Sequence, residues 1–325
     1  MKNISILVPF GVRLNSIEIP RHAFEEVNKI LTAQNKPPVF NIQFVGLADE
    51  IKLNDGLYKI SPNQLIKDVE KTDLIIVPAL QEDVGENLKL NLEFIPWIVK
   101  QYKSGAEVAS LCVGAFLLAA TGLLNGKNCS THWRAANKFR NFFPQVNLVV
   151  DKIMTDEKGI YSSGGAFSSA NLVLYLIEKY AGRDAAIHCS KIFQIDIERG
   201  SQSPFIIFKG QKEHDDETIK SAQEFIENNF KEKITVDHLS EKFRIGRRTF
   251  ERRFRAATFN SVVEYMQRVK IEAAKKQLEL GRKTINEVMF GVGYTDTKSF
   301  RDVFKKITGM SPVDYRKKYN KEAAQ

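Results

Sequence analysis

The feature of this sequence that most constrains its fold is an internal repeat of about 50 residues in the last third of the chain. An apolar pattern that begins at Thr235 returns at Thr284, and each copy continues into a second apolar stretch after a tight turn. The second stretches share five positions, which are Phe250, Phe254, Thr258, Ser261 and Tyr265 in the first copy and Phe300, Phe304, Thr308, Ser311 and Tyr315 in the second. Phenylalanines four residues apart lie on one helix face. Each copy therefore predicts a short helix, a turn and a second helix.

The opposite faces of these second helices are polar and mostly basic. The exposed positions are Arg247, Arg248, Glu251, Arg252 and Arg255 in the first copy, and Thr297, Lys298, Ser299, Arg301, Asp302 and Lys305 in the second. A short helix followed by a basic second helix is a helix-turn-helix arrangement, in which the second helix enters the major groove of double-stranded DNA. A plain helical hairpin would share the apolar spacing but not the clustered charge. We therefore expect these eleven residues to contact DNA, and we place the two helix-turn-helix units at about 236–257 and 284–307.

The distribution of charge agrees with this interpretation. The chain carries a net charge of +9, and the residues from Thr218 onward hold 24 basic and 14 acidic side chains. The preceding 217 residues hold 24 basic and 25 acidic side chains, so the excess positive charge belongs to the last third alone. A basic region beside a neutral one favours a polyanionic partner. A basic face kept only for solubility is the alternative.

The first 200 or so residues show a different pattern, in which short apolar runs alternate with amphipathic stretches. Buried strands separated by helices predict a mostly parallel sheet covered on both faces, an α/β domain. The expected strands are Ile4–Val8, Phe40–Val45, Leu74–Val77, Glu107–Leu111 and Leu148–Ile153. The expected helices are Ile19–Leu31, Leu88–Tyr102, Gly114–Leu123, Trp133–Phe142 and Ala166–Tyr180.

A polar stretch separates the two patterns. We expect a first domain over 1–205, a linker over 206–217 and an all-helical domain over 218–320. No apolar run approaches the roughly 18 residues of a membrane span. Three cysteines, an odd number, do not suggest a disulfide framework and favour a reducing cytoplasm.

The helical region resembles the DNA-binding domain of the AraC/XylS family of transcriptional regulators. The residues that carry the resemblance are Gly291, Val292, Gly293, Tyr294, Asp296, Phe300, Phe304, Lys305, Gly309, Met310, Ser311, Pro312, Tyr315 and Arg316. The resemblance implies two helix-turn-helix units joined by a long helix, here at about Ser261–Leu280. Four positions depart from the family pattern: Gly246 replaces a capping Ser, Phe259 a terminating Gly, Met289 a small Ala, and Asp302 a common Arg. Because a carboxylate accepts from cytosine N4 and repels phosphate, Asp302 is expected to alter which base is read.

Cys112 lies between an expected strand and an expected helix, in a turn that resembles a nucleophile elbow. A helix N-terminus at this point would lower the pKa of the thiol. A buried core cysteine is the structural alternative.

The surrounding region, from Ile4 to about Phe205, resembles the PfpI-type, class I glutamine-amidotransferase-like domain of GlxA-like regulators. The matching residues are Gly122, Leu123, Leu124, Gly126, Thr131, His132, Trp133 and the run from Tyr161 to Gly165. The resemblance implies a flavodoxin-like α/β fold. It also implies a small-molecule sensor or dimerisation module attached to a DNA reader, with a candidate ligand pocket at Ser16, Cys112, Val113, His132 and Gly164.

An enzyme is the rival hypothesis, namely a cysteine-dependent amidohydrolase or a glyoxalase-like enzyme tethered to nucleic acid. A hydrolase needs a base to activate its nucleophile. Active members of the broader fold often have a His after the Cys, whereas Val113 follows here, and Ser16 replaces an Asp that is frequent in the related regulators. We therefore expect no catalytic residues.

Other chemistry has little support in the sequence. Neither the pair Cys129 and His132 nor the pair His188 and Cys189 has the spacing of a four-ligand metal site, and we expect no metal and no cofactor. Gly164 and Gly165 suit either anion binding at a helix N-terminus or a tight turn. The expected function is sequence-specific DNA binding by a cytoplasmic transcriptional regulator. A homodimer, an unknown small-molecule effector and RNA polymerase are its candidate partners, and no membrane is involved.

Overall fold

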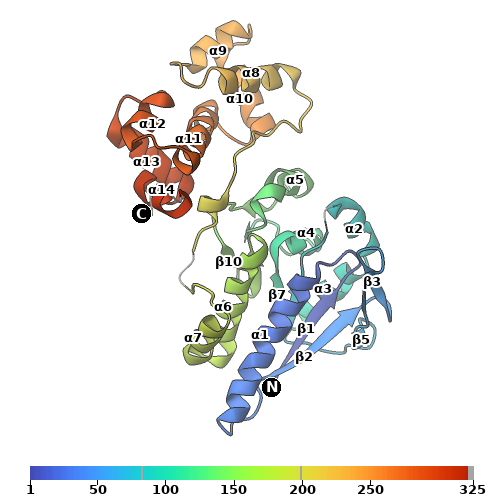
Figure 1. Cartoon of the computed structure of the whole chain (residues 1–325). Helices are drawn as coiled ribbons and strands as arrows, with labels where there is room; N and C mark the ends of the chain where they lie inside the picture. The colour runs from blue at the N-terminus through green and yellow to red at the C-terminus, as the bar shows by residue number, and fades with distance from the viewer. Residues whose placement is uncertain (82, 198–199, 321–325) are drawn as a thin grey trace. The chain divides into compact units, whose positions relative to one another are not determined.

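The computed structural model describes residues 1–81, 83–197 and 200–320, and it divides into two compact units at Gln202 and Ser203. The first unit is built on a seven-stranded sheet with the order β10-β11-β7-β6-β1-β2-β5 (Figure 1). These strands are β1 Lys2–Val8, β2 Phe40–Gly46, β5 Gln64–Leu65, β6 Leu74–Val77, β7 Glu107–Ser110, β10 Met154–Asp156 and β11 Ile160–Ser163. All neighbouring pairs are parallel except the antiparallel β10–β11 pair.

The two faces of this sheet are covered by different helices. Helices α1 (Leu14–Ala33), α6 (Ser169–Ala181) and α7 (Arg183–Ile192) bury one face, where Ile4, Ile6 and Val8 of β1 meet Phe24 and Leu176. The other face lies under α2 (Val84–Leu90), α3 (Phe94–Lys103), α4 (Ala115–Ala120) and α5 (Ala136–Phe142). The expected α/β class is therefore confirmed, because strands buried on both faces form a parallel sheet only when helices cover each side.

Smaller elements complete this unit. Strands β3 (Ile51–Leu53) and β4 (Tyr58–Ile60) form a hairpin, and β8 (Asn128–Cys129) pairs with β9 (Asn147–Leu148). The strand expected at Leu148–Ile153 is wrong, since only Leu148 of that run lies in a strand. The true neighbour of β7 is β11, whose residues Tyr161, Ser162 and Ser163 are all buried. The hydroxyls of Ser162 and Ser163 are bound to other buried groups, and that of Tyr161 is bound to the partly exposed Glu107 and Lys179. The strand therefore lacks the continuous apolar pattern by which a buried strand is predicted.

The described residues of the second unit form helices and their connections, with no strand among them. Its helices are α8 Glu217–Asn228, α9 Val236–Lys242, α10 Arg247–Thr258, α11 Val262–Leu280, α12 Ile285–Gly291, α13 Thr297–Thr308 and α14 Pro312–Tyr319. Two separate cores lie along α11. Tyr265, near its start, packs with α8, α9 and α10, whereas Ile271, Ala274 and Leu278 pack with α12, α13 and α14. The long helix expected at about Ser261–Leu280 is confirmed, and Ser261 caps it through a capping box with Glu264.

The internal repeat is confirmed down to single contacts. Phe254 and Tyr265 meet edge to face with ring centroids 5.3 Å apart, and Phe304 and Tyr315 repeat this contact at 5.5 Å. Both tyrosine hydroxyls donate to a glutamate at 2.5 Å, Tyr265 to Glu227 and Tyr315 to Glu279. The two copies are therefore the same structural unit, and residues 50 apart are equivalent from α10 to α13.

The segment 206–217, expected as a linker, lies in the second unit and packs against its helices. Lys275, only 4% exposed, donates to the carbonyl of Ile206 at 2.6 Å. The ring of Phe208 meets that of Tyr265 edge to face at 5.2 Å. Asp216 caps α8 by accepting from the Ile219 amide, and it forms two hydrogen bonds with Arg253 of α10. This segment therefore forms part of the packing of the helical unit.

Candidate nucleic-acid interface and effector pocket

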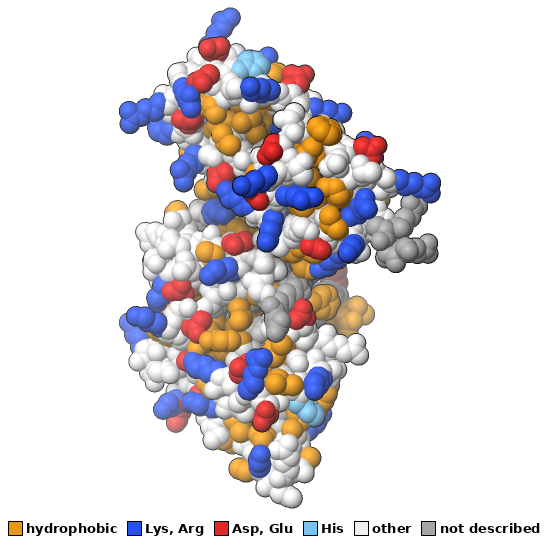
Figure 2. Space-filling view, turned by 90° about the vertical axis from the view of Figure 1, so that its left-hand side faces the viewer, with side chains coloured by type: hydrophobic (Ala, Val, Ile, Leu, Met, Phe, Trp, Pro, Cys, Tyr) orange, Lys and Arg blue, Asp and Glu red, His pale blue; other side chains and the backbone are white. Residues whose placement is uncertain are grey.

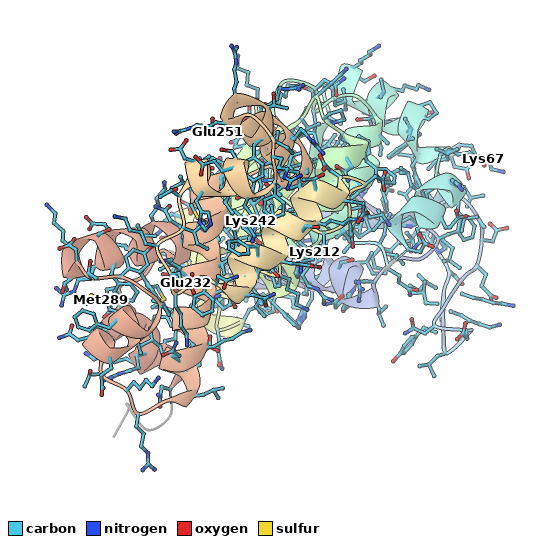
Figure 3. The ribbon with its side chains drawn as sticks, turned by 90° about the horizontal axis from the view of Figure 1, so that it is seen from above. Lys67, Lys212, Glu232, Lys242, Glu251 and Met289 are labelled. Carbon is cyan, nitrogen blue, oxygen red and sulfur yellow. The ribbon has the colours of Figure 1, made fainter. Side chains whose placement is uncertain are left out.

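The outer faces of α10 and α13 carry the residues that the sequence assigned to DNA. Ten of the eleven are exposed, and Thr297 at the start of α13 is half-buried. The phenylalanines of each helix are fully buried on the opposite side. Figure 2 shows Lys and Arg side chains projecting from the surface of the protein, and Figure 3 labels Glu251 on α10 among the side chains of the helical unit. The amphipathic pattern alone thus oriented both helices correctly.

The charged residues of α10 differ in how far they are engaged within the protein. Arg247 pairs with Asp237 at 2.9 Å and with Glu251 at 3.5 Å. Within the described residues, Arg248, Arg252 and Arg255 form no hydrogen bond or ion pair, and they follow one another at i, i+4 and i+7 along one stripe. Arg253 points away from this stripe to Asp216. Three guanidinium groups of α10 are therefore available to an external partner.

The ends of the two helices bear out the departures noted in the sequence. Gly246 provides no side-chain cap for α10, whereas the Asp296 carboxylate caps α13 by accepting from the Ser299 amide at 2.6 Å. Phe259 ends α10 in the left-handed region at φ 55°, where the equivalent Gly309 has φ 74°. Since a side chain in this region costs roughly 1–2 kcal/mol, Phe259 is a strained stop that its glycine counterpart avoids.

Cys112 occupies the turn between β7 and α4, within the 3-10 turn η1 (Cys112–Gly114), with φ at +55°. The Thr131 hydroxyl donates to its carbonyl at 2.9 Å, and Gly114 packs directly on the carbonyls of Val77 and Pro78. The expected strand-to-helix turn is therefore present. The expected lowering of the thiol pKa is wrong: burial raises the pKa of Cys112 to about 11, which outweighs the opposing effects of the Val113 amide and of Arg13.

The other residues expected around Cys112 have defined structural roles. Ser16 is buried in the first turn of α1, where its hydroxyl donates to the Arg13 carbonyl and accepts from the Ala79 amide at 3.0 Å. The His132 ring accepts from the Arg134 amide through Nδ1, and burial lowers the pKa of His132, so this imidazole is neutral at pH 7. Val113 is half-buried in the 3-10 turn, and the Gly164 amide donates to the Ile153 carbonyl at 2.7 Å.

Gln202 was missed by sequence reasoning, although it shapes this region. Its side chain is 1% exposed, and Nε2 donates to the carbonyls of Thr131 at 3.1 Å and Lys152 at 3.2 Å. A Cβ on Gly164 would lie only 2.7 Å from this amide group, so glycine is required there for packing. The Gly164 and Gly165 turn therefore has a structural explanation.

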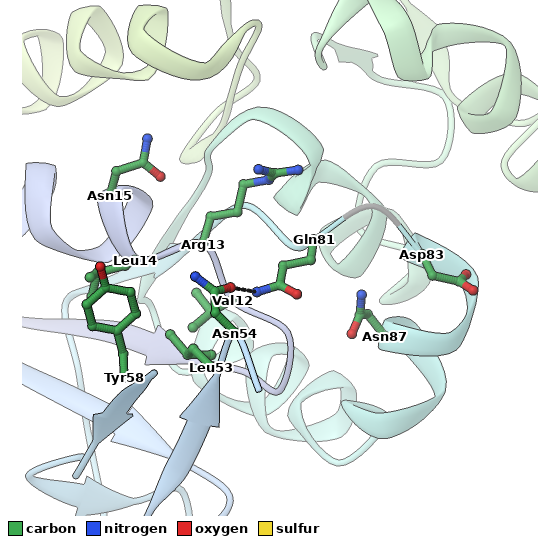
Figure 4. A pocket seen from close by; sticks show the side chains of 10 residues that line it. All are labelled: Val12, Arg13, Leu14, Asn15, Leu53, Asn54, Tyr58, Gln81, Asp83 and Asn87. Atoms are coloured by element: carbon green, nitrogen blue, oxygen red, sulfur yellow. Dashed lines mark hydrogen bonds between the residues drawn. The ribbon is translucent and has the colours of Figure 1, made fainter. Parts of the chain in front are cut away.

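The structure contains an open pocket at another position, with a volume of about 780 Å³ (Figure 4). Its lining comes from the loop after β1, the first turn of α1, the loop after β6, the start of α2 and the β3–β4 hairpin. It consists of Val12, Arg13, Leu14, Asn15, Leu53, Asn54, Tyr58, Gln81, Asp83 and Asn87. The Gln81 amide donates to Asn54 across it at 3.0 Å. The order of the strands reverses between β1 and β6, and α/β domains bind ligands at the carboxyl ends of strands flanking such a point.

This pocket and the Cys112 turn share one neighbour, Arg13. Arg13 lines the pocket, and its positive charge acts on both Cys112 and His132. None of the residues expected to form a ligand pocket lies in this lining; these are Ser16, Cys112, Val113, His132 and Gly164. The rule of the topological switch point could have identified the loops after β1 and β6 from the strand order, but that order was not available from the sequence.

The fold and the two exposed basic helices define a DNA-binding protein of the helix-turn-helix class with a separate α/β domain. The family comparisons agree: the sequence model of the helix-turn-helix domain matches residues 239–318, and that of the DJ-1/PfpI family matches residues 3–179. The chain belongs to the DJ-1/PfpI family, and its second domain is of the AraC type.

The relatives have the same two-domain architecture. The HTH-type transcriptional regulator GbdR of Pseudomonas aeruginosa is 25% identical over 268 residues, which cover 82% of this chain and 72% of GbdR. The HTH-type transcriptional regulator GlxA of Rhizobium meliloti is 21% identical over 66% of each chain. The crystal structure of Drosophila melanogaster DJ-1beta covers 60% of this chain and 98% of its own with a TM-score of 0.50 at 16% identity, which supports the fold of the first unit alone.

The chain is thus a transcriptional regulator, and the rival hypothesis of a cysteine hydrolase gains no support from the comparisons. The high pKa of Cys112 agrees, because a thiol protonated at pH 7 is a weak nucleophile. Among the described residues no helix has both the length and the apolar character to cross a bilayer, and no cluster of potential metal ligands occurs there.

Proposed function

We propose that α10 and α13 of one chain enter two successive major-groove segments on one side of a DNA duplex. The observation that supports this most strongly is the structural equivalence of the two basic helices on either side of α11. The 19 residues of α11 at 1.5 Å each give a rod of about 28 Å. Successive major-groove segments on one side of B-DNA are about 34 Å apart. One chain therefore offers two readers at roughly the spacing that the duplex requires.

Within this proposal, the residues of α10 divide by their partners. Arg248, Arg252 and Arg255 have no partner among the described residues and are assigned to the DNA. Arg247 and Glu251 are held in a small ion-pair group with Asp237, which suits contact at the edge of the groove. On α13 the corresponding contacts are assigned to Thr297, Lys298, Ser299, Arg301, Asp302 and Lys305. An arginine that forms two hydrogen bonds with guanine supplies base recognition, and lysines mainly contact phosphates.

The proposed role of the first unit is to sense a small polar effector in the pocket at the switch point and to pair two copies of the chain. The pocket volume lies within the range of small-molecule sites, and its lining offers one arginine, one aspartate and several amides. A dimer formed by this unit would place a second pair of readers on a repeated site and raise the affinity by linkage. RNA polymerase as a partner and the cytoplasm as the location complete the proposal.

Two neighbouring arginines provide the test of the DNA-binding face. Replacing Arg252, which is exposed and unpaired, should weaken binding to the preferred site by about 1–3 kcal/mol without changing thermal stability. Replacing Arg253, which is bound to Asp216, is the matched control, because it removes the same charge from the inner side of α10. The control should lower stability by about 1 kcal/mol or less and affect specific binding little.

The measurement is titration of a labelled operator, together with random DNA, by the full chain and each variant. Footprinting of the wild type should protect two groove segments about one helical turn apart. Protection of one segment only, or equal losses for Arg252→Ala and Arg253→Ala, would contradict the proposed use of the two helices.

A further inference from the structure

The second helices of the two helix-turn-helix units, α10 and α13, carry opposite charges at one equivalent position. Because the contacts of the buried faces repeat with an offset of 50, Arg252 of α10 corresponds to Asp302 of α13. The neighbouring positions keep their charge: Arg248 corresponds to Lys298, and Arg255 to Lys305. The stripe that faces outward is therefore basic throughout on α10 but is interrupted by a carboxylate in its middle on α13.

Asp302 is not used to stabilise its own helix. It is exposed, and lysines lie one turn away on either side of it, Lys298 at i−4 and Lys306 at i+4. Such spacing normally allows an ion pair. In the described part of the chain, however, Asp302 has no hydrogen bond or ion pair with either lysine or with any other group. The carboxylate is thus unengaged, as the guanidinium of Arg252 is.

The chemistry of a carboxylate limits what it can meet on DNA. It repels phosphate, so an unpaired carboxylate in the middle of the groove-facing stripe is favoured where it faces base edges. There it can only accept hydrogen bonds, and the exocyclic N4 amino group of cytosine is the major-groove donor that Asp and Glu recognise. A guanidinium in the same place donates to guanine O6 and N7.

We propose that the two helix-turn-helix units read different bases at their equivalent positions, guanine through Arg252 and cytosine through Asp302. The inference rests on the proposed function, namely that both α10 and α13 enter the major groove. The proposal also implies that the two helix-turn-helix units contribute differently to the free energy of DNA binding. The helix-turn-helix unit that contains α10 contributes both affinity and specificity. Asp302 lowers the affinity of the unit that contains α13 for DNA in general and makes that unit selective.

The experiment is selection of preferred sequences from a random DNA library by the full chain, followed by titration of single-base variants of the selected site. The wild type should select a cytosine in the second groove segment, and replacing that base should weaken binding by about 5- to 150-fold. Asp302→Ala should abolish this preference and strengthen binding to random DNA. Asp302→Arg gives α13 the residue that α10 has at the equivalent position, and it should change the preferred base from cytosine to guanine.

Two further variants keep the outcomes distinct. Glu224→Gln removes one exposed negative charge from α8, outside both readers, and should leave the base preference unchanged. Lys305→Ala tests whether α13 contacts DNA at all. If Lys305→Ala has no effect on DNA binding, the proposed entry of α13 into the major groove is wrong. If Lys305→Ala weakens binding but Asp302→Ala leaves the base preference intact or weakens every sequence equally, only the present inference is overturned. Thermal unfolding of each variant checks that the fold is retained.

Discussion

Removing the segment that precedes α8 should destabilise the DNA-binding unit strongly, although sequence patterning assigned that segment to a linker. The comparison is between a fragment that starts at Ser203 and one that starts at Thr218, both ending at Asn320. The shorter fragment loses the carboxylate of Asp216, which caps α8 and binds Arg253. It also loses the contact of Phe208 with Tyr265 and the carbonyl that accepts from the buried ammonium of Lys275.

The magnitude follows from these contacts. Loss of an N-cap costs about 1 kcal/mol. The ion pair with Arg253 is partly exposed and contributes less than about 1 kcal/mol. The aromatic contact contributes about 1 kcal/mol, and a hydrogen bond from a buried charged group about 1.5–3 kcal/mol. Together these terms are roughly 3–6 kcal/mol, a large part of the 5–15 kcal/mol that stabilises a typical domain.

Urea denaturation followed by circular dichroism measures the difference. With a slope of about 1–2 kcal/mol per M, the midpoint of the shorter fragment should be lower by at least about 1.5 M urea. A fragment from Ser203 with Lys212→Ala is the control, because it removes only the partly exposed ion pair between Lys212 of the same segment and Glu227 of α8. Equal midpoints for the two fragments would refute the reasoning. The DNA affinity of the isolated domain should therefore be measured on the longer fragment.

Three further outcomes are expected. Cys112 should react with iodoacetamide at pH 8 at least about 100-fold more slowly than a free cysteine, with a rate that rises about tenfold per pH unit toward pH 11; rapid labelling at pH 7 would contradict the buried thiol. Gly246→Ser should stabilise α10 by a few tenths of a kcal/mol, since a Cβ there meets no atom within 4 Å. Gly309→Ala should destabilise α13 by about 1 kcal/mol, because Gly309 has a positive φ. Thermal unfolding that ranks these two variants the other way would disprove the assignment of the helix ends. Gln202→Ala should cost about 2–4 kcal/mol in the unfolding of the first unit, because the carbonyls that it satisfies stay buried, and an unchanged midpoint would show that the side chain is dispensable.

The amino-acid sequence by itself determined the fold class of both units and which faces of α10 and α13 are buried. Helical periodicity is a local property, so Phe250 and Phe254 identified the buried side of α10, and the repeat carried the same conclusion to α13. The long helix at about Ser261–Leu280 was expected from the family resemblance, and the capping residue Ser261 and the apolar stripe of α11 lie in one continuous stretch of the sequence.

Only the tertiary structure decided the properties that depend on partners far along the chain. Strand β11 is recognised by its pairing with β7, about 50 residues earlier, and not by its own polar sequence. Arg252 and Arg253 are identical neighbours in the sequence, yet only Arg253 has a carboxylate in reach, 37 residues away at Asp216. The pKa of Cys112 depends on how many atoms exclude water from its thiol, and this burial outweighs the local helix N-terminus that the sequence made visible.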